Sequence, residues 1–319
     1  MSEIQNVGLV GLGFLGRGIA ASLVAYNVRV IAHVRSADSQ RESETYIERA
    51  MYELVANAGF PPELASQWRD RIEFVTDYES FRGVDFVIET VVKDVEIKNQ
   101  VFDELERVVR SDVPIASNTS SRAVSLLAHR RKHPERFLGM HWAEPAYATR
   151  FIELIRGEKT NDKAFDLATQ LACHVGKEPS LVQKDVPAFV VNRIGYAILR
   201  EALSLFEEGV ADAETIDRSF RHAVGLWAAF AGPLRWVDLS GGPALYGKTM
   251  SNVLPTLSNA TEISPTMRRM MENDDKGITN GRGFYQYTPE EAHQWEDRFR
   301  RSVWHVWRWA DELAREENV

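Results

Sequence analysis

The stretch VGLVGLGFLGRGIAASLVAYNVRVIAHVRS, residues 7–36, decides the fold. It contains an apolar run, a Gly-x-Gly-x-x-Gly turn, an apolar helix-like segment and a second apolar run over 28–34. In a dinucleotide-binding unit, the first glycine allows a sharp turn, the second lets the backbone approach a pyrophosphate, and the third lets the helix pack closely on the strand. The sequence therefore predicts a bound dinucleotide; the alternative is a tight turn with only a structural role. The predicted phosphate turn comprises Gly11, Gly13, Phe14, Leu15 and Gly16.

The end of the second apolar run bears on the choice between NAD and NADP. A carboxylate at this position would accept hydrogen bonds from the ribose hydroxyls of NAD, but Val34 cannot. Arg35 offers a planar fork of donors suited to a phosphate, and Ser36 is a further donor. This pattern favours NADP over NAD. The alternative is a solvated surface arginine on a protein that binds NAD through other contacts.

The order of strand and helix patterns predicts the fold class. Strand and helix patterns alternate through the first half of the 319 residues, whereas the second half is almost wholly helical. We expect a Rossmann-type, doubly wound, mainly parallel sheet followed by an all-helical C-terminal domain. The expected dinucleotide-binding domain spans 1–184, and the expected helical substrate and dimerisation domain spans 185–319.

Composition excludes several classes of protein. A net charge of −8 gives no reason to expect a nucleic acid or an anionic membrane as partner. The chain has no apolar run of membrane-spanning length, so we expect a cytoplasmic protein. Cys173 is the single cysteine, which excludes an internal disulfide framework and a cysteine-based metal site; no metal is expected.

The doubly wound pattern continues beyond residue 80. A buried strand over 84–90, an amphipathic helix over 95–109 and a strand over 113–118 follow one another. Ligands of such sheets bind at the carboxyl ends of the strands, where the polar segment SNTSS, 117–121, falls. The alternative is that these side chains only cap the next helix.

An acid inside an apolar strand suggests a catalytic pair. In GMHWAEPAYATRFIELI, residues 139–155, His141 ends one apolar segment and Glu153 lies inside another. A buried carboxylate costs several kcal/mol unless it is paired, and a histidine on an adjacent strand would pair it. The imidazole would take the proton of a substrate alcohol, while the carboxylate fixes its tautomer and stabilises the imidazolium. A histidine considered alone is more often structural.

Together these motifs resemble the 3-hydroxyacyl-CoA dehydrogenase superfamily, which includes enzymes similar to L-gulonate 3-dehydrogenase (lambda-crystallin) and carnitine dehydrogenase. The matching segments, in order, are GLGFLGRGIA, DFVIET, ASNTSS, the His141 to Glu153 spacing, KDVPAFVVNRI, EALSLFEEGVAD, GPLRWVDLSG and GRGFYQY. The resemblance implies that His141 is the general base and Glu153 its partner, and that hydride passes from the substrate carbinol carbon to nicotinamide. It also implies that Ser120 and Asn192 hold the substrate oxygen and the base, that Lys98 lies near the cofactor, and that the helical domain dimerises.

The chain departs from the family pattern at several positions. Glu144 replaces an amide expected near the nicotinamide, and Lys93 stands where a glutamate is usual, so the two could form a compensating pair at the cofactor. Ala188 replaces a glycine before Phe189. These departures concern the choice of cofactor and substrate.

The stretch before Lys93 bears on coenzyme A. In the resembling acyl-CoA enzymes this region is rich in lysine, but here it has no lysine, and Glu42, Glu44, Glu48 and Glu53 outnumber the nearby Arg41 and Arg49. Such a surface would repel a polyanion within a Debye length of roughly 8 to 10 Å. The alternative is a solvated acidic helix that contacts no ligand, and arginines can bind phosphate as lysines do.

Two further residues are candidate substrate contacts. Tyr147, like Glu144, could hydrogen-bond extra hydroxyls, and Arg150 could clamp a carboxylate or be a surface cation.

The sequence thus predicts an NAD(P)-dependent dehydrogenase that interconverts a 3-hydroxy compound and its 3-oxo partner. A small free hydroxy acid is narrowly favoured as substrate, and a 3-hydroxyacyl-CoA such as 3-hydroxybutyryl-CoA is the alternative. A non-catalytic dinucleotide-binding protein and a non-redox Rossmann enzyme are the other classes considered. We expect a homodimer, and an apolar stripe from Trp295 and Phe299 to Leu313 is predicted to be core or dimer interface.

Overall fold

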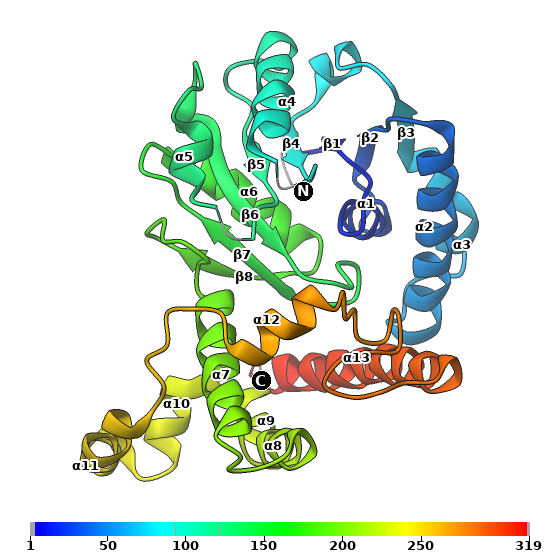
Figure 1. Cartoon of the computed structure of the whole chain (residues 1–319). Helices are drawn as coiled ribbons and strands as arrows, with labels where there is room; N and C mark the ends of the chain where they lie inside the picture. The colour runs from blue at the N-terminus through cyan, green and yellow to red at the C-terminus, as the bar shows by residue number, and fades with distance from the viewer. Residues whose placement is uncertain (1–3, 93, 121, 318–319) are drawn as a thin grey trace. The chain divides into compact units, whose positions relative to one another are not determined.

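The computed structural model describes residues 4–92, 94–120 and 122–317 (Figure 1). Lys93 and Ser121 lie outside the described residues. The chain forms two compact units. The first comprises the described residues up to Asn192 together with Val303–Asp311, and the second comprises Arg193–Ser302 and the described residues from Glu312 on.

The first unit is built on an eight-stranded sheet with the order β3-β2-β1-β4-β5-β6-β7-β8. Neighbouring strands are parallel except β6 and β7, which are antiparallel. The strands are β1 (Asn6–Val10), β2 (Arg29–His33), β3 (Ile72–Val75), β4 (Phe86–Glu89), β5 (Ile115–Ser117), β6 (Phe137–Trp142), β7 (Phe151–Ile155) and β8 (Glu178–Val182). The predicted doubly wound, mainly parallel sheet is confirmed.

Helices cover both faces of this sheet (Figure 1). On one face α1, α2 and α6 pack into a core with β1 and β2, and α4 packs into a separate core on the other face. The helices of this unit are α1 (Gly16–Ala25), α2 (Ala37–Asn57), α3 (Leu64–Gln67), α4 (Val95–Val108), α5 (Val124–Ala128) and α6 (Asp162–His174). Short 3₁₀ turns are η1 (Trp68–Arg71), η2 (Glu79–Gly83) and η3 (Pro134–Arg136). The small side chains of α1 let this helix pack directly on the sheet. Every residue of α1 except Arg17 is therefore buried.

The second unit is helical. Its elements are α7 (Val191–Glu207), α8 (Ala213–Ser219), the π-helical turn η4 (Phe220–Val224), α9 (Gly225–Ala228), α10 (Gly232–Leu239), α11 (Gly242–Val253), the 3₁₀ turn η5 (Leu254–Thr256), α12 (Pro265–Glu272) and α13 (Pro289–Glu317). Within α7 only Leu203 is buried, and no residue from α8 to η5 is buried in the single chain. The prediction of an all-helical C-terminal domain is confirmed.

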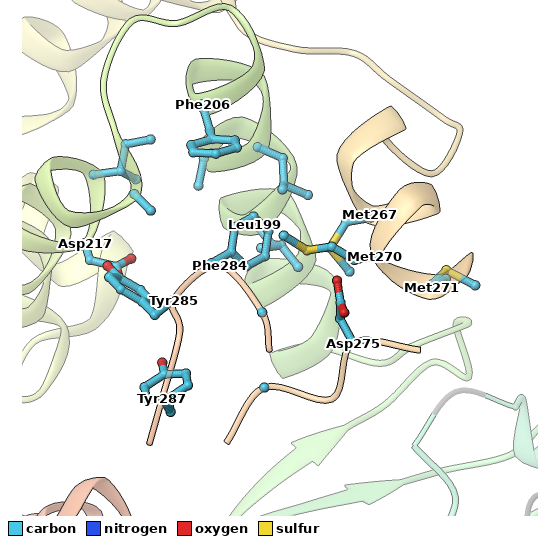
Figure 2. Close-up of a pocket in the computed structure, with 16 residues that line it drawn as sticks. Leu199, Phe206, Asp217, Met267, Met270, Met271, Asp275, Phe284, Tyr285 and Tyr287 are labelled. Atoms are coloured by element: carbon cyan, nitrogen blue, oxygen red, sulfur yellow. The ribbon is translucent and has the colours of Figure 1, made fainter. Parts of the chain in front are cut away.

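A cavity of about 370 Å³ lies inside the second unit. Figure 2 shows its apolar lining: Leu199 and Phe206 from α7, Met267 and Met270 from α12, and Phe284 and Tyr285 from the segment that follows α12. The Tyr285 hydroxyl donates a hydrogen bond to Asp217 Oδ2 at 2.8 Å, so that acid is already paired.

The helix α13 contributes to the first unit through 303–311. Trp304 of α13 is 4% exposed and lies in the core of the first unit, and Val303 and Trp307 pack against that core. The predicted apolar stripe is therefore only partly core: Trp295 and Phe299 are 51% and 58% exposed, respectively. None of the described helices is long and apolar enough to span a membrane.

Candidate active site

The glycine turn between β1 and α1 leaves room for a ligand. Gly11 has a φ of +95°, and a Cβ there would lie 3.0 Å from the carbonyl oxygen of Thr90. A Cβ at Gly16 would lie 2.0 Å from the carbonyl oxygen of Gly11, whereas one at Gly13 would meet no described atom within 4 Å. Leu15, at the N-cap of α1, provides no side-chain cap, and the N–H groups of Gly16 and Gly18 make no hydrogen bond to a described residue, so they are available to an anion, whereas the Arg17 N–H donates to the Gly13 carbonyl oxygen at 3.2 Å. The turn therefore fits the pyrophosphate of a dinucleotide. Phe14, in the same turn, is 65% exposed.

The end of β2 carries one residue suited to a second phosphate. Val34 is buried, and Ser36 is the N-cap of α2, with its Oγ accepting from Ser39 N–H at 3.2 Å. Arg35 is exposed and makes no hydrogen bond or ion pair with any described residue. The Ser36 oxygen thus accepts within α2 while its O–H can still donate, and Arg35 is a second donor without a partner among the described residues.

A buried ion pair lies at the carboxyl end of β4. Lys98 Nζ donates to Glu89 Oε1 at 2.5 Å, and both side chains are almost fully buried. The same carboxylate accepts from Ser117 Oγ at 2.6 Å and from Val91 N–H at 2.7 Å. Lys98 is therefore committed to fixing the loop that follows β4.

The polar segment after β5 ties strand ends together. Asn118 Nδ2 donates to Thr90 Oγ1 at 3.1 Å, and its Oδ1 accepts from Trp142 N–H at 3.1 Å. No side chain caps α5 at its N-cap, Ala123. Asn118 therefore joins the carboxyl ends of β4, β5 and β6 instead of capping the next helix.

The two side chains of the predicted dyad lie in hydrogen-bond contact. His141 and Glu153 are direct register partners across the antiparallel β6 and β7 pair, and His141 Nδ1 lies 2.8 Å from Glu153 Oε2. The other carboxylate oxygen accepts main-chain N–H bonds from Val190 at 3.0 Å and Val191 at 2.8 Å. His141 Nε2 makes no hydrogen bond within the described part of the chain, so it is the nitrogen that can meet a substrate.

The hydrogen bonds to Glu153 outweigh its burial. Burial alone would raise the pKa of this carboxyl, but the bonds from His141 and from the two main-chain N–H groups hold the pKa below its ordinary value. Glu153 is therefore ionised beside the imidazole. This arrangement fixes Nδ1 as the protonated nitrogen and leaves Nε2 able to accept a proton.

The two other predicted catalytic residues are brought together. Asn192 Nδ2 donates to the carbonyl oxygen of Ser120 at 2.7 Å, so the start of α7 is fastened to the segment after β5.

Glu144 lies in a network that the sequence did not reveal. Its Oε1 accepts from the Tyr46 hydroxyl of α2 at 2.6 Å, and its Oε2 is buried without a partner among the described residues. The Arg17 guanidinium lies 4.5 Å from the centre of the Tyr46 ring. Burial raises the pKa of Glu144, although the bond from Tyr46 and the charge of Arg17 oppose that rise. The suggested pair with Lys93 lies outside the described residues.

Tyr147 and Arg150 have partners away from the dyad. The buried Tyr147 donates its hydroxyl to Glu53 Oε2 at 2.7 Å. Arg150 is ion-paired with Glu178 at 2.7 Å and with Asp311 at 2.9 Å. The structure does not bring either side chain to His141, and the Arg150 guanidinium is already neutralised.

Sequence reasoning missed three buried groups around the site. Glu89 is an acid on an apolar strand, the signal that identified Glu153, so the same rule would have found it. Lys177 is buried and donates to the carbonyl oxygens of Ala146 and Thr149 in the β6–β7 loop. Phe189 is fully buried with its ring centroid 5.9 Å from that of His141. For these two residues the sequence gives no periodic or compositional signal.

Comparison with known proteins identifies the family. Residues 6–186 match the NAD binding domain of 3-hydroxyacyl-CoA dehydrogenase, and residues 189–287 match its C-terminal domain. The chain is 33% identical to the 5-formyl-3-hydroxy-2-methylpyridine 4-carboxylate 5-dehydrogenase of Mesorhizobium japonicum, over 91% of this chain and 93% of that protein. It is 32% identical to a probable 3-hydroxybutyryl-CoA dehydrogenase of Deinococcus radiodurans, over 89% of this chain and 100% of that protein.

Solved structures agree with these matches. The crystal structure of an NAD⁺-dependent 5-formyl-3-hydroxy-2-methylpyridine 4-carboxylic acid 5-dehydrogenase superposes with a TM-score of 0.88 at 31% identity, covering 95% of this chain and 97% of that one. The (S)-3-hydroxybutyryl-CoA dehydrogenase of Ralstonia eutropha gives a TM-score of 0.75 at 29% identity, covering 90% and 100%. The fold, the open glycine turn and both family matches place this chain in the 3-hydroxyacyl-CoA dehydrogenase family of oxidoreductases with a nicotinamide dinucleotide cofactor.

Proposed function

We propose that the protein is an NAD(P)-dependent dehydrogenase that interconverts a 3-hydroxy acid and its 3-oxo product, with His141 as general base and Glu153 as its partner. The observation that carries the proposal is the His141–Glu153 hydrogen bond of 2.8 Å at the carboxyl end of β6, in a unit whose glycine turn is open for a dinucleotide. Bound there, the nicotinamide supplies a hydride acceptor.

The residues of the dyad divide the work. His141 Nε2 accepts the proton of the substrate hydroxyl, while Nδ1–H stays on Glu153 Oε2. Glu153 remains ionised and balances the charge of the imidazolium that forms. The bond from Asn192 to the Ser120 main chain holds both residues in place to orient the substrate oxygen.

A small free hydroxy acid is the preferred substrate in this proposal. The helix α2 contains no lysine, and its acidic residues form ion pairs with nearby arginines, as Glu48 does with Arg69 at 3.2 Å. These arginines are therefore already engaged. A surface of this kind offers little attraction to the phosphates of coenzyme A. The pyridine carboxylate dehydrogenase with the TM-score of 0.88 is also named for a substrate without coenzyme A. The relatives named 3-hydroxybutyryl-CoA dehydrogenase support the alternative, a 3-hydroxyacyl-CoA substrate.

NADP is the preferred cofactor in this proposal. Arg35 is exposed and has no partner in the described part of the chain, so its guanidinium can meet a 2′-phosphate. Related proteins use or are described with NAD, which is the competing choice.

A homodimer completes the helical unit. The chain exposes 18477 Å² in total, whereas even two separate compact domains of these sizes would expose about 16,000 Å². Much of the excess is apolar, since Leu226, Leu234 and Leu245 are 72%, 84% and 54% exposed. A second copy that covers these side chains would bury them as a domain core does.

A substrate panel tests the function. The change in absorbance at 340 nm is followed with NAD and with NADP for L-gulonate, carnitine, free 3-hydroxybutyrate, 3-hydroxybutyryl-CoA and 5-formyl-3-hydroxy-2-methylpyridine 4-carboxylate, all at one ionic strength. We expect a free acid to have the highest kcat/KM. If the CoA ester is better by tenfold or more, about 1.4 kcal/mol of transition-state binding, the substrate assignment is wrong. If no compound reacts although the dinucleotide binds, the proposed substrate class is wrong.

A further inference from the structure

The turn that leads into α7 has an unfavourable backbone. Ala188 and Phe189 have φ angles of +65° and +54°, a region that side chains other than glycine rarely adopt. For a bulky residue such as Phe189 this conformation is an outlier. Such strain persists only where the surroundings impose it, and it is concentrated at functional sites.

The surroundings of the turn fix it on both sides. Before it, Asp185 Oδ2 accepts from Ser125 N–H at 2.7 Å. Within it, Phe189 is fully buried in an apolar cluster with Val124, Ile155 and Val182. After it, Asn192 is bonded to Ser120. The turn is therefore held in one conformation by contacts with three separate segments.

The consequence of this conformation is the position of two main-chain donors. The N–H groups of Val190 and Val191 both reach Glu153 Oε1, at 3.0 and 2.8 Å. Val191 is the first residue of α7 and Val190 precedes it, so both donors lie at the N-terminal, positive end of the helix. The same turn places the Phe189 ring 5.9 Å from the imidazole of His141, on which Phe151 packs edge-on at 5.8 Å.

We propose that the 186–191 turn is a positioning device that lowers the proton affinity of the His141–Glu153 dyad. A bare buried carboxylate 2.8 Å from an imidazole would hold a proton on that ring and leave no base. Two N–H donors on the far oxygen draw off part of the negative charge, so the carboxylate attracts a proton to the imidazole less strongly and Nε2 is left to accept one from the substrate. Val190 and Val191 act through Glu153 and do not touch the substrate.

Uncharged groups of three segments lie beside the dyad. β8 contributes Ser180 as the register partner of Glu153, and β7 and the turn contribute the rings of Phe151 and Phe189. The carboxylate of Asp185 lies at the start of the turn and is bonded to Ser125 N–H. The donors of the turn are thus the groups that bear most directly on the carboxylate.

Replacing the Val191 main-chain amide by an ester, through incorporation of the corresponding α-hydroxy acid at this position, tests the proposal. The ester removes the N–H that donates to Glu153 Oε1 at 2.8 Å and keeps the side chain, whereas proline would place its ring Cδ against that oxygen. Protein with valine incorporated at residue 191 by the same method is the matched control. The readout is the NMR titration of the His141 ring in cofactor-free protein, which needs no catalytic activity.

We expect the titration midpoint of His141 to be higher in the ester-containing protein than in its valine control by about half a pH unit to one pH unit. Coinciding midpoints, or a lower midpoint in the ester-containing protein, would overturn the proposal. If the ester-containing protein does not fold, Phe189→Leu is measured against wild type; a smaller upward change is expected because leucine holds the turn less firmly, and no change refutes the proposal.

The inference rests on the proposed function only in calling His141 a base. The acid limb of the kcat/KM profile should move to higher pH with the titration midpoint. A midpoint that moves in a protein without dehydrogenase activity would contradict the proposed function and leave the role of the turn intact.

Discussion

The two units of the chain differ in how completely they bury their apolar surface. In the first unit every residue of β4 is fully buried, and two large cores lie on opposite faces of the sheet. In the second unit the stretch from α8 to η5 buries no residue at all within one chain. The second unit therefore leaves more of its apolar side chains open to further contacts than the first does.

The units also differ in their polar groups. The first unit contains buried, bonded charges such as the Lys98–Glu89 pair and the dyad. In the second unit the Arg218–Glu214 pair is exposed, with side chains 54% and 68% exposed, although Asp275 of the Arg282–Asp275 pair is only 14% exposed. Buried charges are sensitive to substitution and to pH, and exposed ones are not. We therefore expect chemistry to depend on the first unit and assembly on the second.

The largest effect is expected at the dyad. Glu153→Gln should lower kcat by roughly 10⁴-fold, as when the orienting acid of a Ser-His-Asp triad becomes an amide, and His141→Ala should abolish turnover. Cofactor binding, measured by fluorescence titration, should persist because the glycine turn is untouched. Near-wild-type rates in either variant would remove the dyad from the mechanism.

The buried ion pair should show the next largest effect. Lys98→Met leaves the Glu89 carboxylate buried without its cation, which should cost about 3 to 5 kcal/mol in the free energy of unfolding. The control in the helical unit is Arg218→Met, which breaks an exposed pair and should change that free energy by less than about 1 kcal/mol. Both free energies of unfolding are measured by urea denaturation. Equal losses in Lys98→Met and Arg218→Met would mean that the burial of an ion pair does not determine its contribution to stability.

An exposed leucine of the helical unit should be essential for assembly. Leu234 is 84% exposed in the single chain, so Leu234→Glu would be harmless in a monomer. If Leu234 lies at a dimer interface, the substitution should reduce the free energy of dimerisation by about 3 kcal/mol or more. The dimer would then be about a hundredfold weaker.

Analytical ultracentrifugation measures this effect. The matched control is Leu126→Glu in the first unit, where the leucine is 73% exposed and the oligomeric state should not change. A wild-type protein that sediments as a monomer contradicts the homodimer at once.

The sequence predicted the parts of the site that depend on regular patterns. The glycine spacing predicted the dinucleotide turn, and the cost of an unpaired acid inside an apolar strand predicted His141 on an adjacent strand as the partner of Glu153, with which it pairs in register. The resemblance added Asn192, which does meet Ser120.

Contacts between distant segments could not be predicted in this way. Tyr46 lies 98 residues from Glu144, and Glu53 lies 94 residues from Tyr147. These pairs depend on how α2 packs against the β6–β7 loop, which leaves no periodic trace in the sequence. The same reason explains Arg150, whose partner Asp311 is 161 residues away.

Cofactor choice should depend on the first unit alone. With Arg35 bonded to a 2′-phosphate, NADP should be preferred over NAD in kcat/KM by roughly tenfold to above a hundredfold, about 1.5 to 3 kcal/mol, and Arg35→Asp should reverse the order. Arg41→Ala, at an exposed arginine of α2, is the control and should keep the wild-type preference. Equal use of both cofactors by the wild type would show that Arg35 does not determine the choice of cofactor.

The smallest effect is expected from Lys177, whose buried amine donates to the carbonyl oxygens of Ala146 and Thr149. Burial lowers the pKa of Lys177 to about 7, whereas an unfolded chain holds a lysine at about 10.4. Between these pH values the unfolded chain binds one more proton, so the free energy of unfolding rises with pH, by at most about 1.4 kcal/mol per pH unit. Below about pH 7 both states hold the proton and this contribution is constant.

Lys177→Met should therefore flatten the rise in the free energy of unfolding between pH 7.5 and 9.5, by roughly 1 kcal/mol per pH unit relative to wild type. Lys163→Met removes an exposed lysine from the neighbouring helix α6 and controls for the loss of one charge. Urea denaturation at several pH values gives both slopes. If Lys177→Met and wild type have parallel stability profiles over this range, the amine stays protonated in the folded protein, and its two carbonyl partners outweigh the cost of its burial.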